Sequence, residues 1–484
     1  MDLPYWTHED CFIFKAEFNG SITDYSDIIK QYNKLIFSDY NNLESSIEKI
    51  KNGKYFHRSI MGSKFDQPLD NSLNILTNLI NIIFSFLSGQ PLLNPLDKLI
   101  NLTHLTFGES FDKPLANSLN KLINLTHLTF GWNFNQLLSN SLDNLINLTH
   151  LTFGKSFNKP LVNSLDKLIN LTHLTFCREF NQPLANSLNK LMNLTQLAFG
   201  DEFNQPLADS LNKLINLKNL TFGDCFKQPL GNSLHQLVNL THITFGYFFN
   251  QPFSNSLDKL INLTNLTFGY FFNKPLANSL VQLINLTHIT FSWKFNQPLS
   301  NSLDKLINLT HTTFGTNFNQ HLANSLDKLI NLTHITFDYF FDHPLGNSLD
   351  KLINLTHIAF GGKFNQPLNN TLYHLTKLEY LKLEHGFNQE LILPSNIRIL
   401  TLNCNNKNLI DNLPNSIDEL NFGPDFVSPL DNLPSSIKKI KFSKNSKYNN
   451  KLNNLPNSLE QLELPGNYKL EIKNIPLNCK IIYL

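Results

Sequence analysis

Residues 180–202 read FNQPLANSLNKLMNLTQLAFGDE, and a segment of this kind returns every 23 residues along most of the chain. The opening phenylalanine of the segment recurs at that interval from Phe65 to Phe387, with Ser88 as the one exception in the series. Residues 65–386 therefore hold fourteen units of 23 residues without an insertion or deletion. A fixed period of this length is typical of a solenoid, in which each coil stacks directly on the next.

The end of each unit has the pattern of a β-strand. When the opening Phe is counted as position 1, positions 15–20 of the unit that opens at Phe157 read LTHLTF, residues 171–176. Leu174 and Phe176 share one side of such a strand, while the His and Thr that alternate with them share the other. Stacking these strands at ~4.8 Å predicts one continuous parallel sheet.

The rest of each unit predicts a short return to the next strand. The motif Asn-Ser-Leu-x-x-Leu at residues 186–191 predicts a capped turn of helix with inward leucines. Pro183 fixes the entry to that turn, and Gly200 allows a sharp bend after the strand. Positions 1, 5, 9, 12, 15, 18 and 20 are the expected core, each worth ~1.5–3 kcal/mol when filled. Asn at positions 7 and 14 is expected to bond the backbone of its own and the next coil.

Both ends of the chain keep this pattern loosely. After Phe387 the coils shorten, and Leu-Pro-x-x-Ile or Leu-Pro-x-x-Leu appears from Leu393 onward. Near the start, NLESSIEKIK at 42–51 echoes NLPSSIKKIK at 432–441, which favours degenerate capping coils over the alternative of a small helical domain. The predicted domains are a cap at 1–64, the fourteen 23-residue repeats at 65–386, and shorter Leu-Pro coils with a C-terminal cap at 387–484.

Composition excludes several classes of protein. The formal net charge of +1 does not favour binding to nucleic acid or to an anionic membrane, and the first thirty residues contain no apolar stretch that could span a bilayer. The five cysteines are scattered, which predicts neither a metal site nor disulfides and favours a reducing compartment. Asn-Leu-Thr recurs in nearly every unit as a potential glycosylation site, and a secreted chain would risk a glycan on nearly every coil. The cytoplasm or the nucleus is therefore expected, and the cytoplasm is the predicted location. We expect no cofactor and no small-molecule substrate.

Two sets of residues carry a family resemblance. The spacing L-x-x-L-x-F resembles the strand of leucine-rich repeats, and the Phe-Asn-x-Pro-Leu openings with the later Leu-Pro-x-Ser-Ile coils resemble the FNIP repeat family of social amoebae and giant amoeba-infecting viruses. The likeness covers roughly residues 65–464 and departs from the family in its third residue (Gln182 and Lys159 in place of Ile) and its 23-residue period. It implies an α/β leucine-rich-repeat-like solenoid of 20–23-residue coils, with short helical or irregular returns and no catalytic residues.

Two surfaces are candidates for binding. The outward side of the strands carries histidine at position 17 in nine units, which are expected to form plain surface ladders. The alternatives are that these ladders bind a metal ion or respond to pH. Positions 22 and 23, just after the strand, vary from unit to unit and are aromatic in a cluster. The predicted partner-binding residues are Trp132, Tyr247, Tyr270, Trp293, Tyr339, His242, His288 and His311.

These features predict a non-catalytic scaffold that binds a protein partner through the strand face and an aromatic edge. One alternative is a substrate receptor of a ubiquitin ligase, which requires residues 1–64 to bind an adaptor. The other is a structural repeat protein without a single partner. Each unit contains Ser, His and often Asp, but the Ser and Asp fall on the return and the His on the strand, so no catalytic triad is expected.

Overall fold

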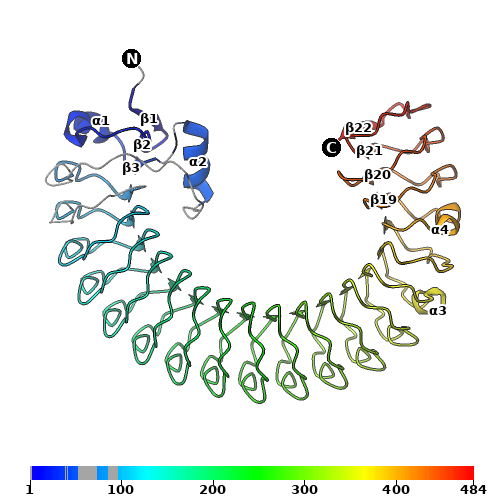
Figure 1. Cartoon of the computed structure of the whole chain (residues 1–484), viewed down its shortest axis with the longest axis horizontal. Helices are drawn as coiled ribbons and strands as arrows, with labels where there is room; N and C mark the ends of the chain where they lie inside the picture. The colour runs from blue at the N-terminus through cyan, green and yellow to red at the C-terminus, as the bar shows by residue number, and fades with distance from the viewer. Residues whose placement is uncertain (1–2, 39, 41, 53–72, 85–95) are drawn as a thin grey trace. The chain divides into compact units, whose positions relative to one another are not determined.

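The computed structural model describes residues 3–38, 40, 42–52, 73–84 and 96–484. The chain divides into two compact units, residues 1–249 and 250–484, each of which is described by itself below. In both units the strands lie along one edge of the stacked coils, and the returns lie along the other (Figure 1). Phe65 and Ser88, which open the first two repeats, lie outside the described residues.

Unit 1 contains a parallel sheet in which each strand from β2 to β11 pairs with the next along the chain. β1 pairs with β2 in the antiparallel sense, before the repeats begin. The helical segments are η1 (Ile22–Tyr25), α1 (Ser26–Ile29) and α2 (Leu43–Asn52). The strands are β1 (Tyr5–His8), β2 (Cys11–Phe14), β3 (Lys34–Phe37), β4 (Asn81–Ile83), β5 (His104–Thr106), β6 (His127–Thr129), β7 (His150–Thr152), β8 (His173–Thr175), β9 (Gln196–Ala198), β10 (Asn219–Thr221) and β11 (His242–Thr244).

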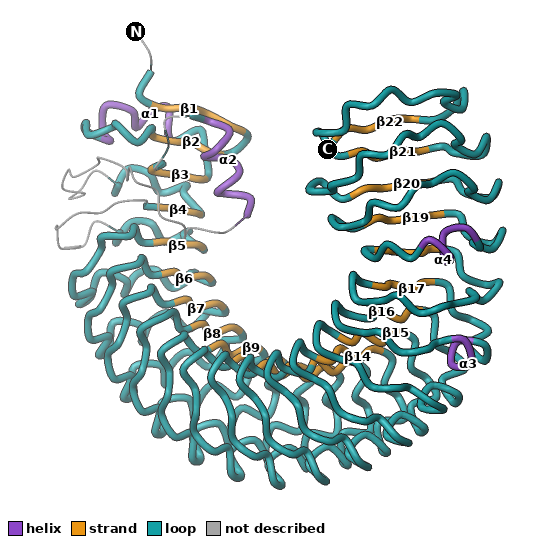
Figure 2. The backbone as a smooth tube through the Cα atoms, turned by 45° about the vertical axis from the view of Figure 1, so that its right-hand side comes forward, coloured by secondary structure: helices purple, strands orange, loops and turns teal. Residues whose placement is uncertain are grey.

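Unit 2 contains a parallel sheet with the same neighbour-to-neighbour order, from β12 to β22 (Figure 2). Its helices, α3 (Asn369–Leu372) and α4 (Lys407–Asp411), are single turns in the returns. The strands are β12 (Asn265–Thr267), β13 (His288–Thr290), β14 (His311–Phe314), β15 (His334–Phe337), β16 (His357–Ala359), β17 (Tyr380–Leu383), β18 (Ile399–Leu402), β19 (Glu419–Phe422), β20 (Lys439–Phe442), β21 (Gln461–Leu464) and β22 (Lys480–Tyr483). The predicted fold class, a parallel solenoid with short returns, is confirmed.

The interior of each coil is filled at the seven predicted positions. In the coil that opens at Phe180, all seven of these side chains are at most 4% exposed. Phe180 stacks on Phe176 of the preceding strand with ring centroids 4.0 Å apart, and on Phe203 of the next coil at 6.1 Å. Two columns of phenylalanine therefore run through the stacked coils, which explains why this chain uses the residue 40 times.

The returns differ from the predicted turn of helix. In most coils the Asn-Ser-Leu-x-x-Leu motif forms successive tight turns, in which the N–H of Ser187 donates to the carbonyl of Leu184 and that of Leu191 to Leu188. The residue at position 6 of each coil from Ala116 to Gly346 has a left-handed backbone, with φ between 38° and 51°. Most of these residues are not glycine, and a side chain in this conformation costs ~1–2 kcal/mol. This left-handed residue lies immediately before the Asn-Ser-Leu-x-x-Leu motif of its coil.

In the coils that have glycine at position 21, this residue serves a purpose other than the predicted bend. The backbone of Gly200 is not in the left-handed region, but a Cβ added there would overlap the carbonyl oxygen of Cys177 in the preceding coil. The same overlap recurs at Gly131 with Gly108 and at Gly223 with Gly200. At these glycines, successive coils therefore approach so closely that a side chain does not fit without a shift of the backbone.

The asparagines at positions 14 and 7 behave differently. At position 14 the amide of Asn193 donates to the carbonyl of Ile169 at 3.0 Å, and equivalent bonds join coil to coil along both units, as predicted. At position 7, Asn186 is exposed and accepts from Asn189 within its own return, so it does not connect two coils. Position 2, which was not predicted to connect coils, does so: the side-chain oxygen of Asn181 accepts from the backbone N–H of Asn204.

Residues 42–51 are similar in sequence to residues 432–441 but have a different secondary structure. Residues 43–52 form helix α2, whereas the matching residues 439–442 form strand β20. Glu44 replaces the proline of the C-terminal copy, and the side chain of Asn42 accepts from the N–H of Ser45 at 2.8 Å, which caps the helix. Leu43 packs on an apolar cluster that includes Ile13, Ile36 and Ile83 of strands β2 to β4. The assignment of residues 1–64 as a cap remains a prediction.

Candidate protein-binding surface

The outward side of the strands, defined here as the strand face, carries two ladders of stacked imidazoles. In unit 1, His104, His127, His150 and His173 stack with ring centroids 4.0–4.1 Å apart. In unit 2, His288, His311, His334 and His357 stack at 4.1–4.3 Å. Parallel pairing with no shift of register places each ring directly above the next, as in His127 opposite His150.

A threonine hydroxyl fixes the tautomer of each histidine. Thr126 donates its hydroxyl to the carbonyl of Thr103 in the preceding coil at 3.0 Å, and the same oxygen lies 2.9 Å from Nδ1 of His127. Since the hydroxyl has one proton and uses it on the carbonyl, Nδ1 must be the donor to the hydroxyl oxygen. Nε2 is then left as an acceptor. The strand face consequently presents rows of imidazole acceptors rather than positive charges.

Burial lowers the pKa of the four ladder histidines of unit 1, and of His311, His334 and His357 in unit 2, which favours their neutral form. Burial first, and then the charges that neighbouring imidazoles would carry, lower the pKa of His127 to about 4. The same causes lower the pKa of His334 to about 4 and lower that of His311 below its ordinary value. Among the described residues no group of three His, Cys, Asp or Glu side chains is placed to hold a metal ion.

The three histidines predicted to bind a partner are not equivalent. His288 and His311 are adjacent members of the unit 2 ladder, with their rings 4.3 Å apart. His242 lies on β11 opposite Asn219 of β10, so it has no histidine beside it on that strand. His242 and His288 are exposed, whereas His311 is half-buried.

Positions 22 and 23, defined here as the rim, have a backbone that is fixed from coil to coil. The N–H of Lys294 donates to the carbonyl of Tyr270 at 3.0 Å, and the N–H of Asn317 donates to Trp293 at 2.8 Å. The same bond joins Lys363 to Tyr339 at 2.8 Å. The rim side chains are thus not needed to fill the interior, but their backbone is ordered. This order limits the conformational entropy lost on binding.

The rim brings together two of the predicted binding residues. Tyr270 and Trp293 stack with centroids 5.3 Å apart and planes 19° from parallel. Trp293 is 46% exposed, and Tyr270 beside it is half-buried. Neither ring fills the coil interior, whose columns are made by Phe272 and Phe295.

The other predicted rim residues have separate surroundings. Tyr247 is exposed and meets Phe248 edge-on at 4.9 Å. Trp132 is half-buried, and the ammonium of Lys155 lies 4.3 Å from its ring centroid. Tyr339 is half-buried, with its ring 5.8 Å from that of His385. The phenylalanines at position 23, for which core and surface were both open, are exposed at 36–45% in Phe248, Phe271 and Phe340.

A row of aliphatic side chains at position 13 was missed by the sequence analysis. From Ile100 to Ile353 this position is Ile, Met or Val in every unit, and each of these side chains is 41–57% exposed. The backbone carbonyl of most of these residues accepts from the Asn side chain at position 14 of the next coil, as at Ile169. The signal was present as an apolar position outside the seven that the interior needs.

Comparison with known proteins supports the fold and part of the family resemblance. The FNIP repeat family model matches residues 387–425 and 405–445, so the resemblance to that family is confirmed for the C-terminal coils. The 23-residue units that the predicted likeness included lie outside the match. No curated protein matches the sequence significantly.

Solved structures with the same architecture include a giant-virus protein. CroV588, described as a novel circular LRR protein, has 26% identity and a TM-score of 0.66, over 99% of this chain and 80% of that one. Toll in the Drosophila Toll–Spätzle complex has 15% identity and a TM-score of 0.62, over 94% of this chain and 64% of that one. The second likeness shows the fold alone. The chain thus has a leucine-rich-repeat-like solenoid fold, which is typical of protein-interaction scaffolds.

No helix in the described part of the chain has the length and apolar character needed to cross a bilayer.

Proposed function

We propose that this chain is a non-catalytic scaffold that binds a protein partner in the cytoplasm, through the aromatic rim and the strand face. If the chain is viral, the compartment is the host cytoplasm. The observation that carries the proposal is the exposed, stacked pair Tyr270 and Trp293 on a rim whose backbone is bonded from coil to coil. Large aromatic side chains that the interior does not need are the usual centres of protein interfaces.

The strand face supports the rim in this role. In unit 2 it offers the Nε2 acceptors of His288 and His311, which are separated from the rim by only a few residues of each coil. The lowered pKa of His311 favours a neutral imidazole, which a partner can cover without burying unpaired charge. Neither surface is linked to a reaction, and we propose no catalytic role for the serines of the returns, which are buried, as at Ser187.

The test is photo-crosslinking from defined positions of the full chain in native host cells. p-Benzoylphenylalanine at Tyr270 is expected to crosslink a protein, and the Trp293→Ala change is expected to weaken that crosslink. The matched control places the same group at Tyr373, which is 79% exposed on a return rather than on the rim. Crosslinks of equal strength from both positions, or crosslinks to nucleic acid, would contradict the proposal.

A further inference from the structure

One coil of unit 2 has three small residues close together, two of which depart from the repeat. The coil at residues 341–363 has Ala359 at position 19, where most coils have Thr, followed by Gly361 and Gly362 at positions 21 and 22. The coils on either side depart in the opposite sense. Position 21 is acidic in two of the fourteen units, at Asp338 and Glu384, and these are the immediate neighbours of the small coil.

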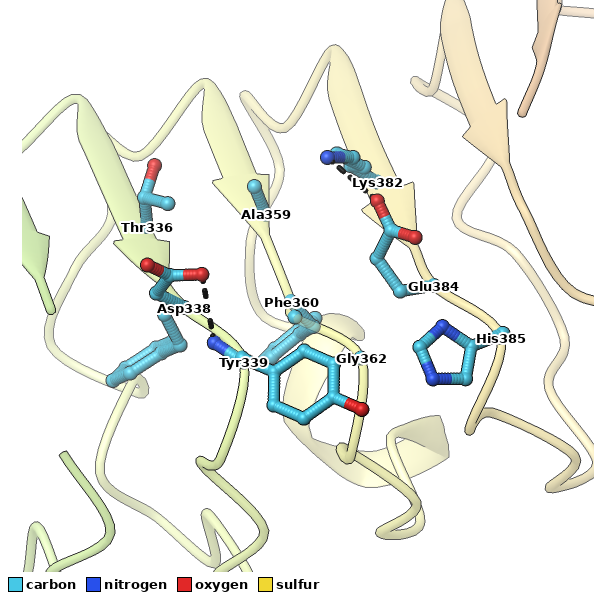
Figure 3. Close-up of a pocket in the computed structure, with 11 residues that line it drawn as sticks. Thr336, Asp338, Tyr339, Ala359, Phe360, Gly362, Lys382, Glu384 and His385 are labelled. Atoms are coloured by element: carbon cyan, nitrogen blue, oxygen red, sulfur yellow. Dashed lines mark hydrogen bonds and ion pairs between the residues drawn. The ribbon is translucent and has the colours of Figure 1, made fainter. Parts of the chain in front are cut away.

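The three small residues leave a pocket of about 290 Å³ at the junction of the strand face and the rim (Figure 3). Asp338 and Glu384 form two walls on either side of the strand that carries Ala359, and Gly361 also lines the pocket (Figure 3). The rings of Tyr339 and His385 close one end. A Cβ added at Gly362 would lie 2.5 Å from the Tyr339 ring and 2.6 Å from the His385 ring, so these two rings approach each other closely above that glycine.

The hydrogen bonds of the two walls leave an excess of negative charge. Glu384 accepts from the ammonium of Lys382 at 2.7 Å and from the amide of Asn403 at 2.8 Å. Asp338 accepts from the hydroxyl of Thr316 at 2.5 Å and from the N–H of Tyr339 at 2.8 Å, both neutral donors. The charged groups that line the pocket are therefore two carboxylates and one ammonium, and Asp338 is the one without a cationic partner among them.

From this geometry we propose that the pocket binds an arginine side chain of the protein partner, with the guanidinium paired to Asp338 and stacked on Tyr339. The inference rests on the proposed function, because it names the residue type that the rim would recognise. A guanidinium is planar, carries five donors in a fixed fork, pairs with a carboxylate through two bonds and stacks on aromatic faces. An anionic ligand is disfavoured by the second carboxylate.

A cation already lies near the aromatic wall. The ammonium of Lys363 is 5.7 Å from the centroid of the Tyr339 ring, so this ring attracts positive charge in the free protein. Lys363 does not line the pocket. Its removal in Lys363→Met is expected to leave the affinity for a guanidinium unchanged or to raise it.

The test measures binding of a short peptide by fluorescence anisotropy with the full chain. The probe is fluorescein-labelled Gly-Ser-Gly-Arg-Gly-Ser-Gly, and the comparison peptide replaces arginine with citrulline, which has the same shape without the charge. We expect saturable binding of the arginine peptide and at least tenfold weaker binding of the citrulline peptide. Asp338→Asn is expected to weaken the arginine peptide at least tenfold.

Filling the pocket provides a second variant that keeps the fold. Ala359→Thr restores the residue that most coils carry and is expected to abolish the difference between the two peptides. The matched control is Ala198→Thr, which makes the same change in unit 1, where position 21 of the flanking coils is Cys177 and Gly223 rather than acidic. This control is expected to bind like the unaltered chain, and melting curves of all variants should coincide.

Equal affinity for the two peptides, an unaffected Asp338→Asn variant, or no saturable binding of the arginine peptide at millimolar concentration would each overturn the arginine assignment. If crosslinking from Tyr270 still succeeds in that case, the proposed scaffold function stands without it. If the arginine peptide binds as expected but Tyr270 gives no crosslink, the pocket assignment survives and the partner does not contact the rim at Tyr270.

Discussion

The interior and the rim of the coils follow the repeat to different degrees. Position 1 is phenylalanine in every described coil from Phe111 to Phe364, and each of these rings is at most 1% exposed. Position 22 of the same coils changes from Trp132 through Arg178 to Tyr270 and Gly362. An interior residue must fit its copies in both neighbouring coils, whereas a rim side chain is released from that demand. Departures from the repeat are therefore the most informative positions about function.

The largest predicted effect tests the interior. Phe180→Ala should lower the free energy of unfolding of unit 1 by about 3–5 kcal/mol, because it removes a ring that contacts three others. The measurement is denaturant unfolding followed by circular dichroism. The control is Arg178→Ala at the rim of the preceding coil, whose ion pair with Glu202 is well exposed and should be worth less than about 1 kcal/mol. Equal losses from the two variants would remove the distinction between interior and rim.

A smaller effect is expected at the boundary between strand and rim. Gly200→Ala should cost about 1–3 kcal/mol, because the added methyl group overlaps the backbone of the preceding coil. Gly231→Ala adds the same methyl group where no atom lies within 4 Å, at a position that is alanine in several other coils. Thermal melting should therefore show a larger drop for Gly200→Ala. The opposite order would mean that glycine at position 21 serves the bend after the strand.

Prediction from sequence succeeded where one coil determines the next. The period, the strand and the seven interior positions follow from a pattern that every coil must share. The described coils have each of them, although the strand covers only positions 17–19 or 17–20 of the predicted 15–20. The role of Gly200 and the left-handed backbone at Val162 were missed, since both depend on how closely two coils approach and how the return closes. The small coil at Ala359 and its acidic neighbours were visible in the sequence, but their juxtaposition became apparent only with the coils stacked.

The smallest expected effect concerns pH and the strand face. His127 and His334 have a folded-state pKa of about 4, below the ordinary 6.5. As pH falls below 6.5, the unfolded chain binds protons that the folded ladders exclude, so stability is lost progressively between about pH 6.5 and pH 4. Replacing both residues with Gln should reduce this loss of stability. Gln is already present on the strand face, at Gln196 opposite His173.

Melting temperature measured against pH checks this prediction. The control is His235→Gln, because His235 lies on a return at position 10 rather than on the strand face. The melting temperature of this variant should fall with decreasing pH as steeply as that of the unaltered chain. An unchanged slope in the His127→Gln, His334→Gln variant would show that the ladders are not held neutral by their packing.

The most direct test of the central claim is the double change Tyr270→Ala, Trp293→Ala, with partner capture and melting measured on the same preparation. The rim is proposed to serve recognition and not folding. The free energy of partner binding should therefore become less favourable by about 2 kcal/mol or more, while the melting temperature stays within about 2 °C. Tyr373→Ala, on a return, should change neither quantity. A collapse of melting would show that these rings belong to the core, and full capture with unchanged melting would place the partner elsewhere on the chain.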